Sequence, residues 1–134
     1  MHGSKRIIFL IDDDPDDQEI FQQAVQKIDP KIRLVQAFGA DEALAKMTCS
    51  QSELPDIIFL DINMPRISGL QLLDLIKQMP QCQHIPVVMY STSSRPEDIR
   101  RSTERGAAAY ITKHCSFDLL CKDIVLVLNK FVLN

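Results

Sequence analysis

The chain has 134 residues, with 15 lysines and arginines against 18 acidic residues, so its formal net charge is −3. This length fits a single domain whose apolar core needs no disulfide or structural metal. The mild acidity argues against direct binding of nucleic acid, which depends on Lys and Arg at the phosphates, and no run reaches the roughly 18 apolar residues of a membrane span.

The start of the chain also lacks the apolar segment of a signal peptide. Four cysteines are scattered without the paired spacing of a zinc site: Cys49, Cys82, Cys115 and Cys121. We therefore expect reduced thiols in a cytoplasmic protein. Residues 1–4, Met-His-Gly-Ser, are interpreted as a cloning remnant or a disordered start.

The first predicted element is a strand over residues 6–11. Its continuous apolar run, Arg-Ile-Ile-Phe-Leu-Ile, is typical of a strand buried on both faces of a parallel sheet. A helix is predicted from about residue 16 to 27, and Pro30 marks its end. The apolar face of this helix is formed by Ile20, Phe21, Ala24, Val25 and Ile28.

A weaker strand pattern comes next, at residues 32–38. The second helix is indicated by one apolar face: Ala43, Leu44 and Met47. Another apolar run, residues 56–60, predicts the third strand. The third helix is closed by Pro80, and its apolar positions are Leu70, Leu73, Ile76 and Met79.

The fourth strand is predicted over residues 86–91, and Pro96 fits the first turn of a helix that ends before Gly106. A weaker strand pattern covers residues 108–113, after which Ser116 is expected to cap a fifth helix that runs to the end of the chain. Five strands in strict alternation with five helices demand right-handed crossovers. The prediction is a doubly wound α/β fold, with a parallel sheet covered by helices on both faces.

Ligands of doubly wound sheets bind at the carboxyl ends of the strands. Polar residues stand at four of these ends: Asp12, Asp13 and Asp14 at the first strand, Asp61 at the third, Ser91 and Thr92 at the fourth, and Lys113 at the fifth. Carboxylates that converge at one edge repel one another and need a cation, and ligands that are all oxygen favour Mg²⁺. For Asp14, Asp16 and Asp17, capping of the following helix is the alternative interpretation.

Asp61 ends a buried strand, and a carboxylate there can attack phosphorus to give an acyl phosphate. A neighbouring Mg²⁺ would neutralise the incoming charge, and the Lys113 ammonium would meet a phosphoryl oxygen or Asp61 itself. The Ser91 hydroxyl would bond another phosphoryl oxygen. Taken alone, Ser91 or Lys113 is also compatible with a routine polar residue at a strand end.

Four short motifs stand in order at the predicted strand ends: residues 11–14 (Ile-Asp-Asp-Asp), 60–65 (Leu-Asp-Ile-Asn-Met-Pro) with Gly69, 86–92 (Pro-Val-Val-Met-Tyr-Ser-Thr) and 106–113 (Gly-Ala-Ala-Ala-Tyr-Ile-Thr-Lys). Together they resemble the receiver domain of bacterial response regulators in two-component signalling. The resemblance covers residues 5–132 and implies one receiver domain. The implied fold is three-layered and flavodoxin-like, with a five-stranded parallel sheet in the order 2-1-3-4-5.

The resemblance also implies that Asp61 is the phosphoacceptor. It would take its phosphoryl group from a histidine kinase or a histidine phosphotransfer protein. Asp13 would bind Mg²⁺ directly and Asp12 through water, and the backbone carbonyl of Asn63 would be a further ligand beside Asp61. Beyond its own aspartyl phosphorylation and dephosphorylation, the protein is expected not to be an enzyme.

The family's switch residues match this sequence as well. Ser91 stands at the hydroxyl position, with Thr92 beside it as a candidate phosphoryl contact. Tyr110 stands at the aromatic position, and Lys113 matches the family's lysine. Phosphoryl oxygens at Asp61 would bond the Ser91 hydroxyl better in an active state, and Tyr110 would fill the space vacated. From the residues alone, Tyr110 is equally a partly buried strand aromatic.

The sequence departs from the family after the lysine, where a proline in a cis bond is usual and His114 stands instead. A cis bond before a non-proline residue costs about 2.5–4 kcal/mol, so we expect a trans bond between Lys113 and His114. The change bears on the rate or lifetime of phosphorylation rather than on the fold. His114 has two interpretations: it makes the loop sensitive to pH, or it is a surface histidine without a role.

No output module follows the receiver in this sequence, so we expect the signal to pass to an unidentified downstream protein or onward by phosphotransfer. The last helix has a core stripe: Phe117, Leu120, Cys121, Ile124, Leu128 and Phe131. Nearly the opposite face carries three leucines, Leu119, Leu126 and Leu133. They are interpreted either as an interaction patch or as scattered surface residues without a role. By the resemblance, the fourth helix, fifth strand and fifth helix would contact a partner or form a homodimer.

Three other functions are compatible with parts of the pattern. A phosphatase of the haloacid-dehalogenase type would need a second acid where Asn63 stands. A flavodoxin-like cofactor binder would need a phosphate cradle in place of the acids at residues 12–17. A receiver fold used as an interaction module without phosphorylation is supported only by His114.

Overall fold

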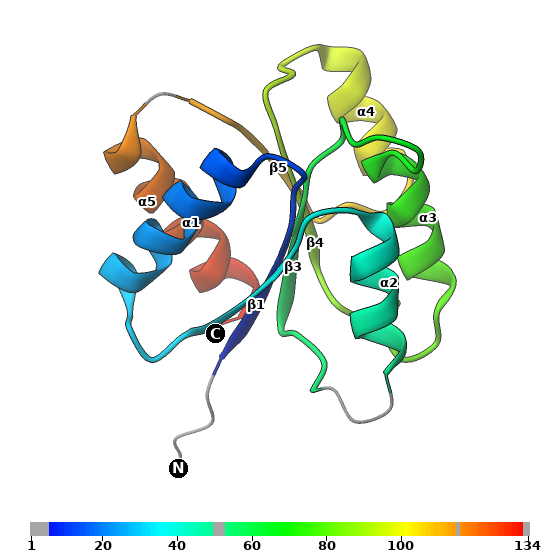
Figure 1. Ribbon diagram of the computed structural model, residues 1–134. Helices are drawn as coiled ribbons and strands as arrows, with labels where there is room; N and C mark the ends of the chain where they lie inside the picture. Colours follow the sequence, from blue (N-terminus) through cyan, green and yellow to red (C-terminus); the bar gives the residue numbers. More distant parts are fainter. Residues whose placement is uncertain (1–5, 50–52, 115, 133–134) are drawn as a thin grey trace.

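The computed structural model describes residues 6–49, 53–114 and 116–132. Within these ranges, strands and helices alternate: β1 (Ile7–Ile11), α1 (Pro15–Ile28), β2 (Arg33–Ala37), α2 (Ala40–Thr48), β3 (Ile57–Leu60), α3 (Gly69–Gln78), β4 (Val87–Ser91), α4 (Pro96–Glu104), β5 (Ala109–Thr112) and α5 (Phe117–Phe131). The strands form one parallel sheet in the order β2-β1-β3-β4-β5. Helices α1 and α5 cover one face, and α2, α3 and α4 cover the other (Figure 1). The predicted fold is confirmed.

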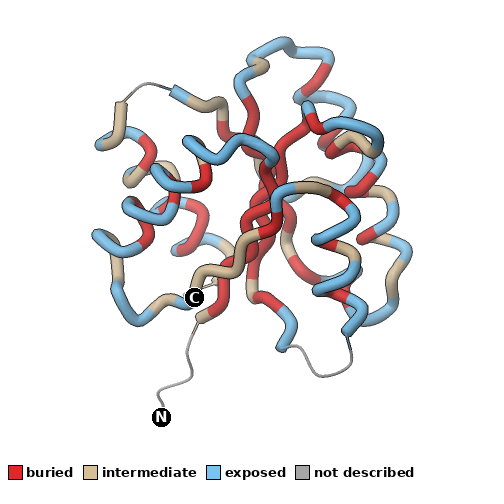
Figure 2. Tube along the Cα trace, in the orientation of Figure 1, coloured by how far each residue is buried: buried red, intermediate tan, exposed pale blue. Residues whose placement is uncertain are grey.

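Alternation along the central strands divides the core into two layers. In β1, Ile8 and Leu10 share a buried cluster with residues of α1 and α5, whereas Phe9 and Ile11 share one with residues of α2 and α3. Strand β3 repeats the pattern. Figure 2 shows buried chain running through the sheet and exposed chain on the outer sides of the helices. The apolar runs are therefore strands buried on both faces, as predicted.

The buried face of α1 is narrower than the sequence predicts. Phe21, Ala24 and Val25 are buried against the sheet, in agreement with the helical periodicity. The prediction for Ile20 is wrong, because its side chain is 43% exposed. At about 100° per residue, Ile20 lies a quarter turn away from Phe21, which takes the position facing the sheet.

Two polar residues fix the start of α1 against the strand ends. Gln18 is buried, and its Nε2 atom donates to the carbonyls of Asp12 at 3.0 Å and Ala37 at 2.8 Å, so it ties the helix to β1 and β2. Asp14 is the N-cap, and its carboxylate accepts from the N–H of Asp16 at 2.9 Å. The capping interpretation is thus confirmed for Asp14, and Pro15 occupies the first helical position.

At the other end of the chain, Ser116 caps α5 as predicted, accepting from the N–H of Leu119 at 3.2 Å. Cys82 and Cys121 are free thiols. Three predictions, for residues 1–4, Cys115 and Leu133, fall outside the described residues. Among the residues described, no helix is both long and apolar enough to cross a bilayer.

Candidate functional site

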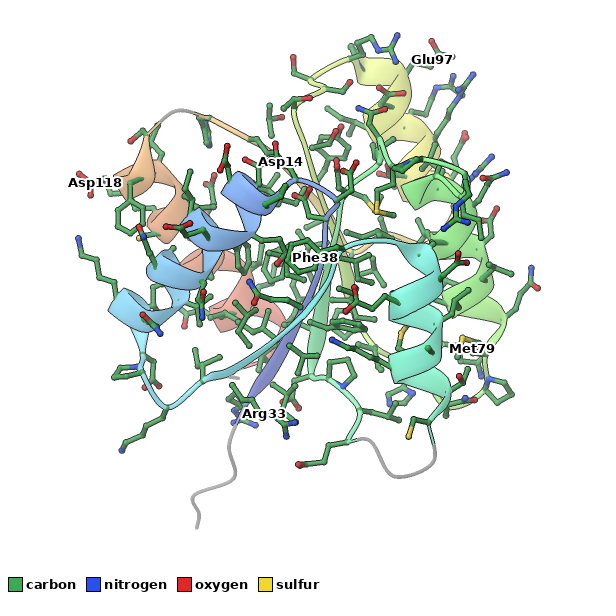
Figure 3. All side chains as sticks on the ribbon, in the orientation of Figure 1. Asp14, Arg33, Phe38, Met79, Glu97 and Asp118 are labelled. Atoms are coloured by element: carbon green, nitrogen blue, oxygen red, sulfur yellow. The ribbon has the colours of Figure 1, made fainter. Side chains whose placement is uncertain are left out.

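The carboxyl ends of four strands bring polar residues to one edge of the sheet. Asp12 follows β1, Asp61 follows β3, Ser91 ends β4 and Lys113 follows β5. Backbone hydrogen bonds continue the ladders past the strands. The Asp61 N–H donates to the last carbonyl of β1 at 3.0 Å, and the Lys113 N–H donates to the Ser91 carbonyl at 2.8 Å. In Figure 3, the labelled residue Asp14, at the start of α1, shows where this edge lies.

Three carboxylates form the centre of the site. Oxygens of Asp12, Asp13 and Asp61 all lie within 4.8 Å of one another. Asp12 is fully buried and Asp61 is 5% exposed, so water cannot fully solvate either charge. The buried Oδ2 of Asp12 has no hydrogen bond of good geometry, although the Lys113 ammonium lies 2.8 Å away. A set of oxygen donors with an unsatisfied buried acceptor fits a hard divalent cation such as Mg²⁺.

Burial shifts the pKa of two of these acids, Asp61 and Asp12. It raises the pKa of Asp61 to about 6; the charge of Lys113 opposes the rise, and those of Asp12 and Asp13 add to it. Burial also raises the pKa of Asp12, against the close contact with the Lys113 ammonium. Close to neutral pH the metal-free site therefore holds negative charge at an energetic cost, which a cation would relieve.

Lys113 supplies the positive charge within the site. Its Nζ atom lies 2.7 Å from an oxygen of Asp17, 2.8 Å from one of Asp12 and 3.7 Å from one of Asp61. Burial alone would lower the pKa of Lys113, but its close contacts with the carboxylates of Asp12 and Asp17 raise it above its usual value. The ammonium stays charged at every physiological pH, and it sits 5.0 Å from the centre of the Tyr90 ring.

From the sequence, Asp17 is interpreted as one of the acids that cap the following helix. The structure adds its contact with Lys113, which the sequence analysis does not predict. Asp17 precedes the buried Phe21 by four residues, so it stands on the same face of α1, one turn nearer the site. That spacing is the signal that could have identified it. Asp16, next to it in sequence, is exposed.

A chain of hydrogen bonds links the end of β4 to β5. Ser91 is fully buried, and its hydroxyl accepts from the N–H of Ser93 at 3.3 Å. The hydroxyl of Tyr110 donates to the Ser93 carbonyl at 2.7 Å. Thr92 lies exposed between these two serines. The two predicted switch residues are therefore joined through Ser93, which the sequence analysis does not single out.

Asp98, in the first turn of α4, was also missed. It is buried, and it accepts from the Ser93 hydroxyl at 2.5 Å and from the Arg95 guanidinium at 3.0 Å. The Ser93 hydrogen bond, with the Arg95 contact, holds the pKa of Asp98 below its usual value. The loop between β4 and α4 is thus fixed by a charged residue. An acidic residue in the first turn of a helix is ordinarily explained by its favourable interaction with the helix dipole. Nothing in the sequence therefore distinguishes Asp98 from such an ordinary acid.

Gly69 allows α3 to begin directly against the end of β3. A Cβ at this residue would lie 2.0 Å from the carbonyl oxygen of Asp61. The Gly69 N–H donates to the carbonyl of Ile62 at 2.8 Å, which holds the two segments together. The N–H of Asn63 lies 3.4 Å from an oxygen of Asp61. The carbonyl of Asn63 as a metal ligand stays a prediction.

The residue that departs from the family pattern lies beside this site. No peptide bond among the described residues is cis, so the bond between Lys113 and His114 is trans, as expected. The ring Nε2 of His114 lies 2.9 Å from a carboxylate oxygen of Asp123 in α5. His114 is therefore a surface residue with a defined partner.

The outer side of α5 carries exposed leucines. Leu119 is 44% exposed and Leu126 is 66% exposed, while Leu120, Ile124 and Leu128 are buried. The apolar stripe and the opposite leucines thus lie where the helical spacing puts them. A role of this surface in binding stays a prediction.

The sequence matches the response regulator receiver domain family over residues 8–125. The chain belongs to this family. Among curated proteins, this receiver domain is 31% identical over 117 residues to the response regulator Rcp1 of Synechocystis sp., covering 81% of this chain and 76% of Rcp1. It is 33% identical over 118 residues to a probable cyclic di-GMP phosphodiesterase of Vibrio cholerae, covering 87% of this chain. The receiver domain spans only 25% of that phosphodiesterase and 14% of a gliding motility regulatory protein of Myxococcus xanthus.

Solved structures agree with the family match. The phosphorylated cyanobacterial phytochrome response regulator RcpA superposes with a TM-score of 0.87 at 28% identity, covering 96% of this chain and 95% of that one. The Mn²⁺-bound form of Rcp1 gives a TM-score of 0.80 at 28% identity, covering 94% and 93%. The chemotaxis protein CheY4 of Vibrio cholerae, at 23% identity and a TM-score of 0.80, supports the fold alone.

Proposed function

We propose that this receiver domain accepts a phosphoryl group on the carboxylate of Asp61, with Mg²⁺ as its cofactor. The observation that carries the proposal is the position of Asp61 beside two other carboxylates, all within 4.8 Å, and 3.7 Å from the Lys113 ammonium. A carboxylate nucleophile, a cation site and a fixed positive charge are the groups that transfer of a phosphoryl group to oxygen requires.

The proposed donor is a phosphohistidine of a histidine kinase or of a histidine phosphotransfer protein. One oxygen of Asp61 forms the new O–P bond as the P–N bond breaks, and the departing imidazole keeps the electron pair and takes a proton from water. Asp12, Asp13, Asp61 and the carbonyl of Asn63 would hold Mg²⁺, which when bound offsets the charge that gathers on the phosphoryl oxygens. Lys113 meets one of those oxygens.

Similar structures support the phosphoryl group and the metal ion of this proposal. One similar structure is described as phosphorylated, that of RcpA, and another as Mn²⁺-bound, that of Rcp1. RcpA and AtBRR are described as response regulators of a phytochrome and a bacteriophytochrome. A kinase of the phytochrome type, acting in the cytoplasm, is therefore a candidate donor for this chain.

The proposed response begins at Ser91. A phosphoryl oxygen on Asp61 accepts a hydrogen bond from the Ser91 hydroxyl, and Thr92 is a further candidate contact. Moving Ser91 shifts Ser93, and with Ser93 the hydrogen bond from Tyr110. The change thereby reaches α4, β5 and α5. We propose that this surface, with Leu119 and Leu126, binds a downstream protein or a second copy of the chain.

The test is the intact mass of the protein after incubation with Mg²⁺ and acetyl phosphate. We expect one added phosphoryl group on the wild type, none on Asp61→Asn, and none when Mg²⁺ is removed by chelation. Asp16→Asn is the matched control, because it removes a carboxylate from the exposed side of the first turn of α1. This control should be modified like the wild type.

The same experiment decides the alternative, a receiver fold that binds its partner without phosphorylation. A wild type that stays unmodified under conditions that modify another receiver domain would contradict the proposal. Modification of His114→Pro alone would then trace the defect to the residue after Lys113.

A further inference from the structure

The closest partner of the Lys113 ammonium is not one of the acids at the strand ends. It is Asp17, in the first turn of α1, at 2.7 Å, against 2.8 Å for Asp12 and 3.7 Å for Asp61. An ammonium carries three N–H donors in a fixed tetrahedral arrangement. One of them donates to Asp17 in a hydrogen bond of good geometry, and the ammonium also lies in ion-pair contact with Asp12, so the directions left for the other donors are restricted.

The distance to Asp61 is too long for a good hydrogen bond. A phosphoryl group on Asp61 extends beyond the carboxylate and brings its oxygens closer to the ammonium. Lys113 is therefore held at a position suited to the modified side chain rather than to the free one. Without Asp17, the flexible lysine chain would have one carboxylate anchor at hydrogen-bond distance, Asp12.

The backbone of Asp17 is anchored within the first turn of α1. The carboxylate of Asp14 caps the helix and lies 3.5 Å from the Asp17 N–H. One turn later, Phe21 is fully buried and packs edge-on against Phe59 of β3, with the ring centres 4.9 Å apart. The cap and the buried ring fix the first turn of α1 relative to the sheet, and with it the backbone from which the Asp17 side chain extends.

We propose that Asp17 is a positioning residue, which holds the Lys113 ammonium where a phosphoryl oxygen on Asp61 can accept a hydrogen bond from it. This inference rests on the proposed phosphorylation of Asp61 and adds to it a residue outside the strand ends. Asp17 is not among the three clustered carboxylates, and it positions the phosphoryl group's lysine partner through its contact with Lys113.

A simpler electrostatic effect predicts the opposite result. Asp17 adds a negative charge near an anionic donor, so its removal would speed phosphorylation if charge alone mattered. Positioning predicts a loss: Asp17→Ala is expected to lower the rate of modification by acetyl phosphate about tenfold, because misplacing a catalytic group by about 1 Å costs up to about a hundredfold. Asp17→Asn keeps an oxygen acceptor without the charge, and it should recover most of the rate.

The experiment measures this rate at saturating Mg²⁺ for the wild type, Asp17→Ala, Asp17→Asn and the matched control Asp16→Ala. A further pair compares Lys113→Ala with and without Asp17→Ala. Because Asp17 acts through Lys113, adding Asp17→Ala to the Lys113→Ala protein should change its phosphorylation rate by less than about twofold. A rate for Asp17→Ala equal to or above that of the wild type, or an undiminished effect without Lys113, would overturn the proposal.

A second readout is independent of phosphorylation. The ¹⁵N resonance of the Lys113 side-chain ammonium, assigned by its loss in Lys113→Arg, is visible only when its protons are protected from exchange with water. We expect it in the wild type and in Asp16→Ala, and we expect its loss in Asp17→Ala. Absence from the wild type, or persistence in Asp17→Ala, would contradict the positioning role. A wild type that shows this signal but takes no phosphoryl group would refute the proposed function instead.

Discussion

The hydroxyl of Tyr110 donates a 2.7 Å hydrogen bond to the main-chain carbonyl of Ser93, across the gap between β5 and the loop after β4. Ser93 also bonds to Ser91 through its N–H and to Asp98 through its hydroxyl. One residue therefore connects the buried end of β4, the aromatic ring on β5 and the first turn of α4. In the proposed mechanism, Ser93 is the residue through which a change near Asp61 reaches the surface.

Removing one hydroxyl tests this connection. Tyr110→Phe keeps the ring but loses the hydrogen bond, which is expected to cost about 0.5–1.5 kcal/mol of local stability. We expect backbone amides of residues 92–95 to exchange with deuterium about two- to tenfold faster, with little change at β1. Unchanged exchange in this loop would show that the Tyr110 bond does not hold it.

The buried charge of Asp61 predicts a gain in stability when it is removed. Its pKa of about 6 in the folded protein lies above the ordinary value of 3.8, so folding takes up a proton between these pH values. The stabilisation from the protonated acid is full below about pH 4 and is lost as the pH rises through about 6. Asp61→Asn should therefore raise the free energy of unfolding by about 1–3 kcal/mol at pH 8 without metal.

Denaturant titrations at several pH values measure this difference. It should shrink as the pH falls from 8 to 4, and it should shrink at pH 8 when Mg²⁺ stabilises only the wild type. Asp16→Asn, an exposed acid of α1, should change stability by less than about 0.5 kcal/mol at either pH. A gain for Asp61→Asn that is the same at every pH would contradict the assignment of a buried carboxylate with a raised pKa.

Gly69 is predicted to be essential for the shape of the site. Because a Cβ would lie 2.0 Å from the Asp61 carbonyl oxygen, Gly69→Ala must move α3 or the end of β3. We expect a loss of about 2–4 kcal/mol in unfolding free energy and slower phosphorylation of the folded fraction. Gly39→Ala is the matched control. No atom lies within 4 Å of a Cβ there, so its stability should stay within about 1 kcal/mol of the wild type. Equal behaviour of the two variants would refute the close approach.

The proposed binding surface on α5 has its own test. Leu126 is 66% exposed, so Leu126→Glu should leave the melting temperature almost unchanged. It is expected to weaken association with a partner or a second copy, as measured by sedimentation across protein concentrations before and after phosphorylation. A phosphorylation-dependent assembly that survives Leu126→Glu would exclude this surface.

The sequence predicted the parts of the molecule that depend on local pattern. Apolar runs identified β1, β3 and β4 because parallel strands buried on both faces need them, and a doubly wound sheet gathers its strand ends at one edge. Asp12, Asp13 and Asp61 could be grouped on that basis. The contacts that were missed depend on tertiary geometry. Asp17 and Asp98 sit in first turns of helices, where an acid has an ordinary capping role, and only the folded chain shows that they hold Lys113 and Ser93.

Ile20 and Gln18 show the same limit within one helix. A prediction from helical periodicity places the apolar side chains in the core, so it buries the isoleucine rather than the glutamine. The carbonyls of Asp12 and Ala37, beyond β1 and at the end of β2, reverse this choice, because a buried amide can donate to them and an alkyl chain cannot. These two carbonyls come together beside α1 only once the strands are paired.

The central claim is that the carboxylate of Asp61 becomes an acyl phosphate, and chemical trapping tests it most directly. Borohydride reduces an aspartyl phosphate to homoserine, which peptide mass spectrometry locates in the chain. After treatment with acetyl phosphate and Mg²⁺, the account predicts homoserine at position 61 alone, and none when Mg²⁺ is chelated. An unmodified Asp61, or homoserine at Asp12 or Asp13 instead, would contradict it.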